Sequence, residues 1–237
     1  MKHLYAVIAF ALLTGTAHAV TYHVPGDFAT IQDAINAASD GDVILIEAGT
    51  YNETYLNTDT KAVHVKGTTN SDGVPITRID GGGEDGNILL IDAGETETTI
   101  FEDLIISNGY AGNGAAMFLD GTSPTIRNCI FESNTAYHDQ GGAVYCFDCS
   151  AQFTGCTFQD NTAETIGGAV WIDGSSSPSF VECTFADNTA NGPGGGGIYC
   201  EPNTGVTLSD CIFSGNVVDG VWGGGGLCLE DNVIATV

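Results

Sequence analysis

Basic residues are scarce in this sequence, which has five lysines and arginines against thirty aspartates and glutamates. The formal net charge is −25 at pH 7. Binding to nucleic acid depends on contacts from Lys and Arg to phosphate, so this shortage excludes it. The excess of carboxylates predicts a well-solvated surface. Carboxylates are also preferred ligands of Ca²⁺, so a calcium site remains open, although no other cofactor is indicated.

Proline and long apolar runs are also in short supply. Six prolines beside 33 glycines exclude a collagen-like chain, and a hydrophobic content of 43% argues against disorder. The apolar run from Leu4 to Leu13 is too short to span a bilayer, and no later run reaches the roughly eighteen residues that a spanning helix needs. The sequence therefore predicts no transmembrane segment in this chain.

The first nineteen residues have the pattern of a secretory signal. A basic start precedes the apolar run, and the segment ends in an A-x-A cleavage site made by Ala17 and Ala19. We expect residues 1–19 to be removed by cleavage near Ala19, so that the mature protein begins near Val20. The expected location is extracellular or at the cell surface, where disulfides could form.

A repeat of about 27 residues dominates the second half of the chain. A Cys-x-Phe motif occurs four times, and its cysteines are separated by 27, 27 and 28 residues. Each motif is followed at the same offset by an asparagine, and a Gly-Gly block recurs in phase. The cysteines are Cys129, Cys156, Cys183 and Cys211, the asparagines are Asn134, Asn161, Asn188 and Asn216, and the blocks begin at Gly141, Gly167, Gly195 and Gly224.

Each repeat contains three short strand-like segments separated by Gly, Asn, Asp and Ser, and none has a helical period. A leucine-rich repeat would show leucines at its own spacing, and a propeller blade would need about 40 residues. The sequence therefore predicts an all-β fold, a parallel β-helix with three strands per coil. We expect it to be right-handed, because crossovers between parallel strands generally are.

The remaining segments fit the same architecture. Residues 20–42 are expected to form an N-terminal cap, with an amphipathic helix over 27–38 that covers the open first coil and ends before Gly41. Residues 43–113 indicate irregular coils, and residues 114–237 indicate regular ones. Because the last coil breaks off within a strand, we expect the chain to be truncated at its C-terminus.

Equivalent residues of successive coils should lie about 4.8 Å apart along the axis and share one core. The expected core columns are the four cysteines; Phe131, Phe158, Phe185 and Phe213; Val144, Val170, Ile198 and Leu227; and Ile126, Phe153, Phe180 and Leu208. In-register side chains suit the disulfide torsion poorly, so the cysteine column should hold mostly free thiols. The Cys146-x-x-Cys149 motif favours a local disulfide or plain packing over redox or zinc chemistry. The asparagines are expected in turns, with their amides bonded along the axis.

The strand after each Gly-Gly block should turn one aromatic column outward, with a column of carboxylates two residues further on. The aromatic residues are Phe118, Tyr145, Trp171 and Tyr199, and the carboxylates are Asp120, Asp173, Glu201 and Glu230, with Phe147 interrupting the second column. Such rows suit sugar rings, which stack on aromatic faces and donate hydroxyl hydrogen bonds to carboxylates. They also suit a protein partner anchored by Tyr and Trp, or they simply stabilise a parallel sheet.

The repeat resembles that of a known family of surface proteins. Phe-x-x-Asn motifs beginning at Phe131, in alternation with Gly-Gly-Ala-Val at Gly141, resemble the repeat of the polymorphic outer-membrane proteins from Gly114 to the end. This resemblance implies a surface-displayed autotransporter passenger, associated with the outer membrane, with an adhesive role toward a glycan or a surface protein. The N-terminal segment, from Phe28-Ala29-Thr30-Ile31-Gln32 to Gly49-Thr50-Tyr51, is similar to the capping segment of the pectin-lyase-like superfamily.

That superfamily includes many polysaccharide-active enzymes, so a pectate-lyase-like polysaccharide lyase or a glycoside hydrolase is the alternative. Similar lyases use an arginine or lysine base beside Ca²⁺-holding carboxylates, whereas only Arg78 and Arg127 are expected within the coils, the second of them in a turn. Val170-Trp171-Ile172-Asp173 resembles a pectate-lyase signature, but Gly174 replaces its histidine, and Asn57-Thr58-Asp59 resembles a polygalacturonase motif without its partners.

One further pair in a loop, His138-Asp139, resembles a general acid/base pair. A lone exposed pair is a weak signal of catalysis. We therefore assign no catalytic residue and no metal ligand from the sequence, and expect a binding protein rather than an enzyme.

Overall fold

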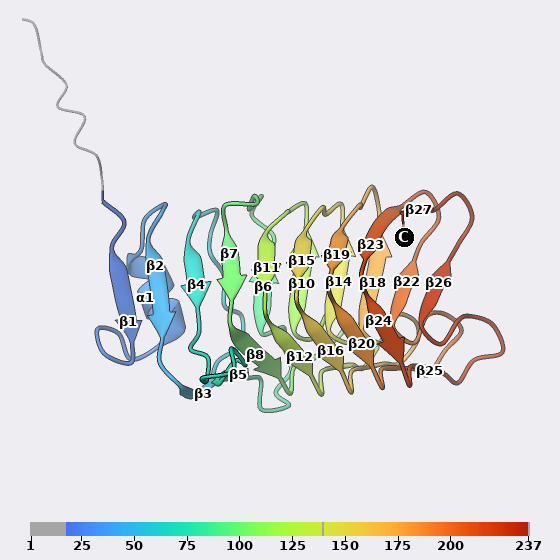
Figure 1. The fold of residues 1–237 in the computed structure, drawn as a ribbon, viewed down its shortest axis with the longest axis horizontal. Coiled ribbons are helices and arrows are strands. Elements are labelled where there is room, and N and C mark those ends of the chain that lie inside the picture. The colour runs from blue at the N-terminus through green and yellow to red at the C-terminus, as the bar shows by residue number, and fades with distance from the viewer. Residues whose placement is uncertain (1–17, 139, 237) are drawn as a thin grey trace, which may run out of the picture.

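Strands one coil apart pair in parallel along the chain, whose computed structural model describes residues 18–138 and 140–236 (Figure 1). The chain therefore winds as a β-helix, with α1 at one end and the last coils at the other. Most of the predicted signal sequence, residues 1–17, lies outside the described residues. In the part that is described, no helix has the length and apolar character needed to cross a membrane.

Three sheets run along the axis of the β-helix, as the three-strand coil predicts. The first contains β1 (Thr21–Val24), β2 (Val43–Ile46), β4 (His64–Lys66), β7 (Ile100–Glu102), β11 (Thr125–Arg127), β15 (Gln152–Thr154), β19 (Ser179–Val181), β23 (Gly205–Ser209) and β27 (Ile234–Thr236). The second contains β3 (Gly49–Asn52), β5 (Thr77–Asp80), β8 (Leu104–Ser107), β12 (Ile130–Glu132), β16 (Thr157–Gln159), β20 (Thr184–Ala186) and β24 (Ile212–Ser214). The third contains β6 (Leu89–Ile91), β10 (Met117–Asp120), β14 (Val144–Phe147), β18 (Val170–Asp173), β22 (Ile198–Cys200) and β26 (Leu227–Leu229).

A fourth sheet of two-residue strands adds to the predicted coil. It contains β9 (Tyr110–Ala111), β13 (Thr135–Ala136), β17 (Thr162–Ala163), β21 (Thr189–Ala190) and β25 (Val217–Val218). Each of these strands joins the second sheet to the third. A two-residue strand still makes ladder hydrogen bonds to its neighbours, as in Thr162 N to Asn134 O at 2.9 Å. Alternation over four or more residues cannot reveal a strand this short.

One position in the regular coils differs from the prediction. Arg127, expected in a turn, is the last residue of β11 and pairs in register with Glu102 and Thr154. The turn is made instead by Asn128, whose φ of 47° lies in the left-handed region that Asn tolerates. The bend therefore comes one residue after Arg127.

The N-terminal helix α1 (Ile31–Ala37) is shorter than the predicted 27–38. Thr30 caps it by accepting a hydrogen bond from Asp33 N at 3.1 Å, and the Glu53 carboxylate accepts from Ile31 N at 2.8 Å. Asp27 is wrong as the helix start because it belongs to the preceding turn, where its N–H donates to His23 O at 2.7 Å. The buried face of α1 still packs against the core of the first coils, as expected of a cap.

The predicted phenylalanine column forms a continuous stack. Ring centroids are 4.8 Å apart from Phe131 to Phe158, 4.7 Å from Phe158 to Phe185, and 4.7 Å from Phe185 to Phe213. The interplanar angles are 4°, 3° and 7°. The columns that begin at Ile126 and Val144 lie in the same core, so the predicted shared interior is confirmed. Phe213, in the last of these coils, is only partly buried.

The asparagine column is a hydrogen-bonded ladder that is fully buried except at its last member, Asn216. Asn134 Nδ2 donates to Asn161 Oδ1 at 2.9 Å, Asn161 Nδ2 to Asn188 Oδ1 at 2.9 Å, and Asn188 Nδ2 to Asn216 Oδ1 at 2.8 Å. Each amide also reaches the coil before it, as in Asn161 Nδ2 to Phe131 O at 2.9 Å. Because every rung uses both neighbours, the ladder confirms the expected bonding along the axis and fixes the register of each turn.

The cysteines divide as the sequence indicates. The four members of the cysteine column are free thiols, and burial raises the pKa of Cys129 to about 12, so this thiol is neutral and packs as an apolar group. Cys146 and Cys149 form the local disulfide, with their Cα atoms 5.5 Å apart. Both cysteines are fully buried in the core, which favours a structural role for the motif.

Replacing a ring inside the phenylalanine stack should cost far more than replacing the ring of the last described coil. We expect Phe158→Ala to lower the free energy of unfolding by about 3–5 kcal/mol, because the ring is fully buried between two like rings. Phe213→Ala is the matched control and should lose clearly less. Urea unfolding followed by circular dichroism measures both, and equal losses would contradict a continuous stack.

Candidate functional site

The third sheet carries the predicted aromatic column on its outer face. Phe118, Tyr145, Trp171 and Tyr199 are register partners on β10, β14, β18 and β22. The centroids of Phe118 and Tyr145 are 5.0 Å apart, and those of Tyr145 and Trp171 are 4.4 Å apart with their planes 26° from parallel. These rings form a cluster separate from the core, so the predicted alternation along the strand is confirmed.

Their expected exposure is wrong. Tyr145 is 9% exposed, and Trp171 and Tyr199 are each 8% exposed. The rings cover one another, and the loop before each strand approaches closely: Ile166 packs on the cluster, and a Cβ on Gly167 would lie 3.1 Å from Trp171 Cβ. The Gly-Gly blocks in the sequence could have indicated this close approach, because only glycine leaves room for the neighbouring chain at these positions. The ring faces of the three residues are therefore largely unavailable to a ligand.

The carboxylate row is more accessible than the rings. Asp120 and Glu230 are exposed, whereas Asp173 and Glu201 are half-buried. Two of the rings donate hydrogen bonds to this row: Trp171 Nε1 to Glu201 Oε1 at 3.3 Å, and Tyr199 OH to Glu230 Oε1 at 2.8 Å. The aromatic column therefore orients carboxylates that face solvent. The predicted site residues do lie together, but the rings support the carboxylates rather than standing beside them.

Burial and like charges set the protonation of the row. Burial raises the pKa of Glu201, the neighbouring charges of Asp173 and Glu230 raise it further, and the hydrogen bond from Trp171 lowers it. Burial also raises the pKa of Tyr145 and Tyr199 above the usual range, so both hydroxyls stay protonated at neutral pH. The surface thus presents closely spaced acceptors with no cation among them.

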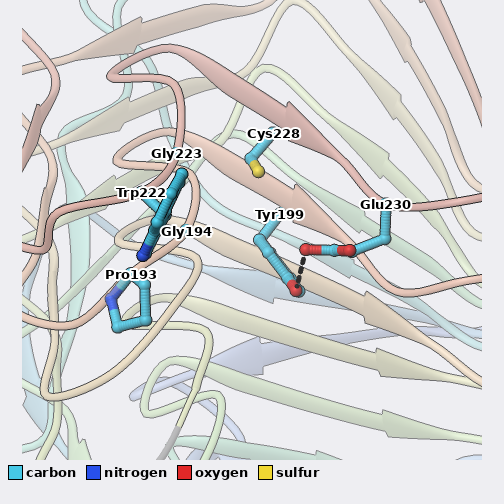
Figure 2. A pocket seen from close by; sticks show the side chains of 7 residues that line it. All are labelled: Pro193, Gly194, Tyr199, Trp222, Gly223, Cys228 and Glu230. Carbon is cyan, nitrogen blue, oxygen red and sulfur yellow. Dashed lines mark hydrogen bonds between the residues drawn. The ribbon is translucent and has the colours of Figure 1, made fainter.

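A pocket of about 270 Å³ lies where the row meets the loop that contains Trp222 (Figure 2). It is lined by Pro193, Gly194, Tyr199, Trp222, Gly223, Cys228 and Glu230. The hydrogen bond between Tyr199 and Glu230 lies along one side, and Trp222 is 77% exposed. The sequence argument missed Trp222, since it lies in a loop of variable length and not in a column. The loops before the Gly-Gly blocks differ in length from coil to coil. Such variation on a constant scaffold could have indicated a binding site, because recognition residues are often on loops of this kind.

The residues considered for catalysis are not brought together. Arg78 Nη2 pairs with Glu132 at 2.6 Å, and Lys66 Nζ, which also lies in a coil, pairs with Glu102 at 2.7 Å. Arg127 is exposed on the first sheet, away from the carboxylate row of the third.

The remaining weak motifs are likewise separate. Thr58 Oγ1 donates to Glu95 at 2.8 Å on the inside of an early coil. The ring of His138 contacts that of Tyr137 at an interplanar angle of 55°, and its predicted partner Asp139 lies outside the described residues. Among the described residues, no three His, Cys, Asp or Glu side chains are grouped to hold a metal ion, and a calcium site stays a prediction.

A stack of parallel coils closed by a helix at one end defines the class: this is a parallel β-helix protein. The chain belongs to the family described as right handed beta helix region, whose model matches residues 61–234, and the predicted handedness is confirmed. The fold is that of the pectin-lyase-like superfamily. The narrower resemblance to polymorphic outer-membrane proteins stays a prediction.

Two solved structures with this fold are of the pectin methylesterase from Aspergillus niger. The deglycosylated form has a TM-score of 0.56 and 14% identity, with 94% of this chain and 76% of that chain covered. The form with an N-acetylglucosamine stub has a TM-score of 0.58 and 15% identity over the same shares. Such low identity shows a common fold only. A comparison of its sequence with those of curated proteins found no match.

The raised pKa of Glu201 predicts a pH-dependent cost to stability. A carboxylate whose pKa is raised by folding contributes stability below its ordinary pKa and loses that contribution as the pH rises through the folded value. Glu201→Gln should therefore increase the urea midpoint at about pH 7, with the gain vanishing near about pH 3, where both side chains are neutral. The same measurement on Asp120→Asn, in the exposed part of the row, is the control. A gain that persists at the acidic pH would contradict this account.

Proposed function

We propose that this protein is a secreted or surface-displayed β-helix that binds a neutral glycan along the carboxylate row of its third sheet. The observation that carries the proposal is a pocket lined by two different groups: the Glu230 carboxylate, which accepts a hydrogen bond from Tyr199, and the exposed Trp222. A carboxylate accepts hydroxyl hydrogen bonds, and an indole face offers a platform for the C–H face of a sugar ring. Both features needed to hold one sugar therefore line the same hollow.

The row beyond the pocket supports the binding of further sugars. Glu201 and Asp173 continue toward the preceding coils, and coils repeat at about 4.8 Å, close to the length of one sugar ring in a chain. Oligosaccharides running along the axis would meet a carboxylate in successive coils, with the interruption at Phe147. The net charge of −25 disfavours acidic polysaccharides, so neutral sugars are the proposed ligands.

Secretion and display at the cell surface, in association with the outer membrane, form the second part of the proposal. The pattern of residues 1–19 supports export, and the Phe-x-x-Asn repeat supports an adhesin-like role. Recognition of a surface protein at the same row is the competing form of this function. It would use the same exposed ring as an anchor, because Trp is frequent among residues that dominate binding energy.

A polysaccharide-active enzyme is the second candidate, favoured by one observation: the half-buried Glu201 has a raised pKa beside the carboxylate of Asp173. Glycoside hydrolysis uses a pair of carboxyl groups, one of which is a general acid with a raised pKa. Incubation with neutral and acidic polysaccharides, with and without Ca²⁺, would reveal new reducing ends or unsaturated products. Turnover abolished by Asp173→Ala would establish the enzyme and overturn the binding function.

Binding itself is tested with variants of the pocket. On an array of neutral and acidic oligosaccharides, the wild type should retain neutral glycans, and Trp222→Ala should weaken them by about tenfold or more, equivalent to about 1.4 kcal/mol. Trp222→Phe, which keeps a ring, should retain part of the affinity, and Glu230→Gln should weaken binding through the lost charge. Trp222 is exposed, so its replacement should not affect folding. Binding that is indifferent to both Trp222→Ala and Glu230→Gln would refute the proposed site.

A further inference from the structure

A second aromatic group lies on a different surface, beside the fourth sheet, and consists of Tyr55, Tyr110 and Tyr137 around Asp85. We refer to these four residues as the tyrosine–aspartate cluster. The rings of Tyr110 and Tyr137 are stacked, with centroids 4.4 Å apart and planes 20° from parallel. Tyr137 OH donates to Asp85 Oδ1 at 2.9 Å, and Tyr55 OH donates to Asp85 O at 3.2 Å. Asp85 thus connects Tyr55 and Tyr137, and Tyr110 joins the group through its stack on Tyr137.

Unlike the rings of the third sheet, these rings reach solvent. Tyr55 is 54% exposed and Tyr110 is 38% exposed, and Asp85 is exposed as well. The ring of Tyr55 lies so close over Gly86 that a Cβ on the glycine would come within 2.5 Å of it. The hydroxyl bonds and this contact hold the rings in place before any ligand arrives. A preorganised surface of this kind loses little side-chain entropy on binding.

The β-helix itself does not require these tyrosines. Tyr110 pairs in register with Thr135, and the same column continues with Thr162, Thr189 and Val217. Tyr137 follows β13 at a position that Glu164 and Asn191 occupy after β17 and β21. Tyr55 has a φ of 57°, in the left-handed region that bulky residues rarely adopt and that often marks functional sites. Residues that depart from the repeat, at some conformational cost, point to a role other than folding.

The charge around the cluster is uncompensated. Of the basic side chains in the described part of the chain, Lys66 and Arg78 form ion pairs with glutamates, and Lys61 Nζ donates to Ile35 O at 2.8 Å. No ion pair within the described residues involves Asp85. Arg127, the remaining basic side chain of the described residues, is exposed on the first sheet. A second copy of this chain could offer little beyond that residue, and its own net charge of −25 would repel a like molecule. The complementary charge has to come from a different molecule.

We infer that the tyrosine–aspartate cluster binds an arginine or lysine side chain of a partner protein. The cation would lie over the exposed rings of Tyr55 and Tyr110, where the ring quadrupole attracts it, and would pair with the Asp85 carboxylate. Arginine fits best, because its planar guanidinium stacks on an aromatic face while it forms hydrogen bonds to a carboxylate. The net charge of −25 would steer such a basic partner toward the surface.

The experiment uses the full chain and a fluorescent peptide in which arginine and glycine alternate. The matched probe carries citrulline, which has the shape of arginine without its charge. Anisotropy titrations at about 0.15 M salt, where exposed charges further apart than about 8 Å are largely screened, should show binding of the arginine peptide alone. The double variant Tyr55→Ala/Tyr110→Ala leaves the net charge unchanged and should weaken binding by about fivefold or more.

Three controls separate this site from general attraction and from the proposed glycan site. Tyr110→Phe, which keeps the ring, and Trp222→Ala, which alters only the glycan pocket, should bind the peptide as the wild type does, while Asp85→Asn should bind it more weakly. Equal binding by the double variant and the wild type would overturn the inference, since bulk charge alone would then explain it. Absence of peptide binding would also overturn it, as would competition by a neutral oligosaccharide, which would make the cluster a glycan site.

Discussion

The whole structure depends on the register between successive coils. A parallel sheet alone tolerates slippage, because its backbone hydrogen bonds are the same in every register. The buried asparagine ladder removes that freedom: a shift by one residue would leave the Asn161 amide without its partners on Phe131 and Asn188. An unsatisfied buried polar group costs about 1–3 kcal/mol, so each rung penalises any other alignment. The phenylalanine stack then adds the apolar contacts that a single coil could not bury.

Because the interior is fixed in this way, the coils can differ on the outside at little cost. The third sheet shows one use of that freedom, with Trp171 and Tyr199 buried against their loops and orienting Glu201 and Glu230. The tyrosine–aspartate cluster shows another, in coils where Ile79 and Ile106 continue the phenylalanine column inside the core. Exposed rings of both proposed binding surfaces, Trp222 and Tyr55, thus lie outside the regular columns, whereas the core columns stabilise the fold.

The period in the sequence was enough to predict the parallel β-helix, the core columns, the asparagine ladder and the free thiols. Each of these follows from the stacking of equivalent residues of successive coils. Alternation along the strand gave the side of the sheet that Trp171 faces, but not its exposure, which depends on how closely the glycine loop approaches. The helix start at Ile31 and the strand position of Arg127 depend on individual capping and turn residues, Thr30 and Asn128, which periodicity does not reveal. The tyrosine–aspartate cluster could not be predicted in this way. Its three tyrosines come from coils of different length, so no constant spacing in the sequence indicates that they lie together.

The most direct test of the register is the deletion of one coil. Thr157 and Thr184 are register partners, so deleting residues 157–183 removes a whole coil and joins Cys156 to Thr184 with every column intact. Deleting residues 157–184 removes one residue more and turns Phe185 out of its column. The account predicts that the first deletion folds, with a strand-rich circular dichroism spectrum and a cooperative urea transition, and that the second does not. If both deletions fold equally well, or both fail, the claim that coil register governs this structure is contradicted.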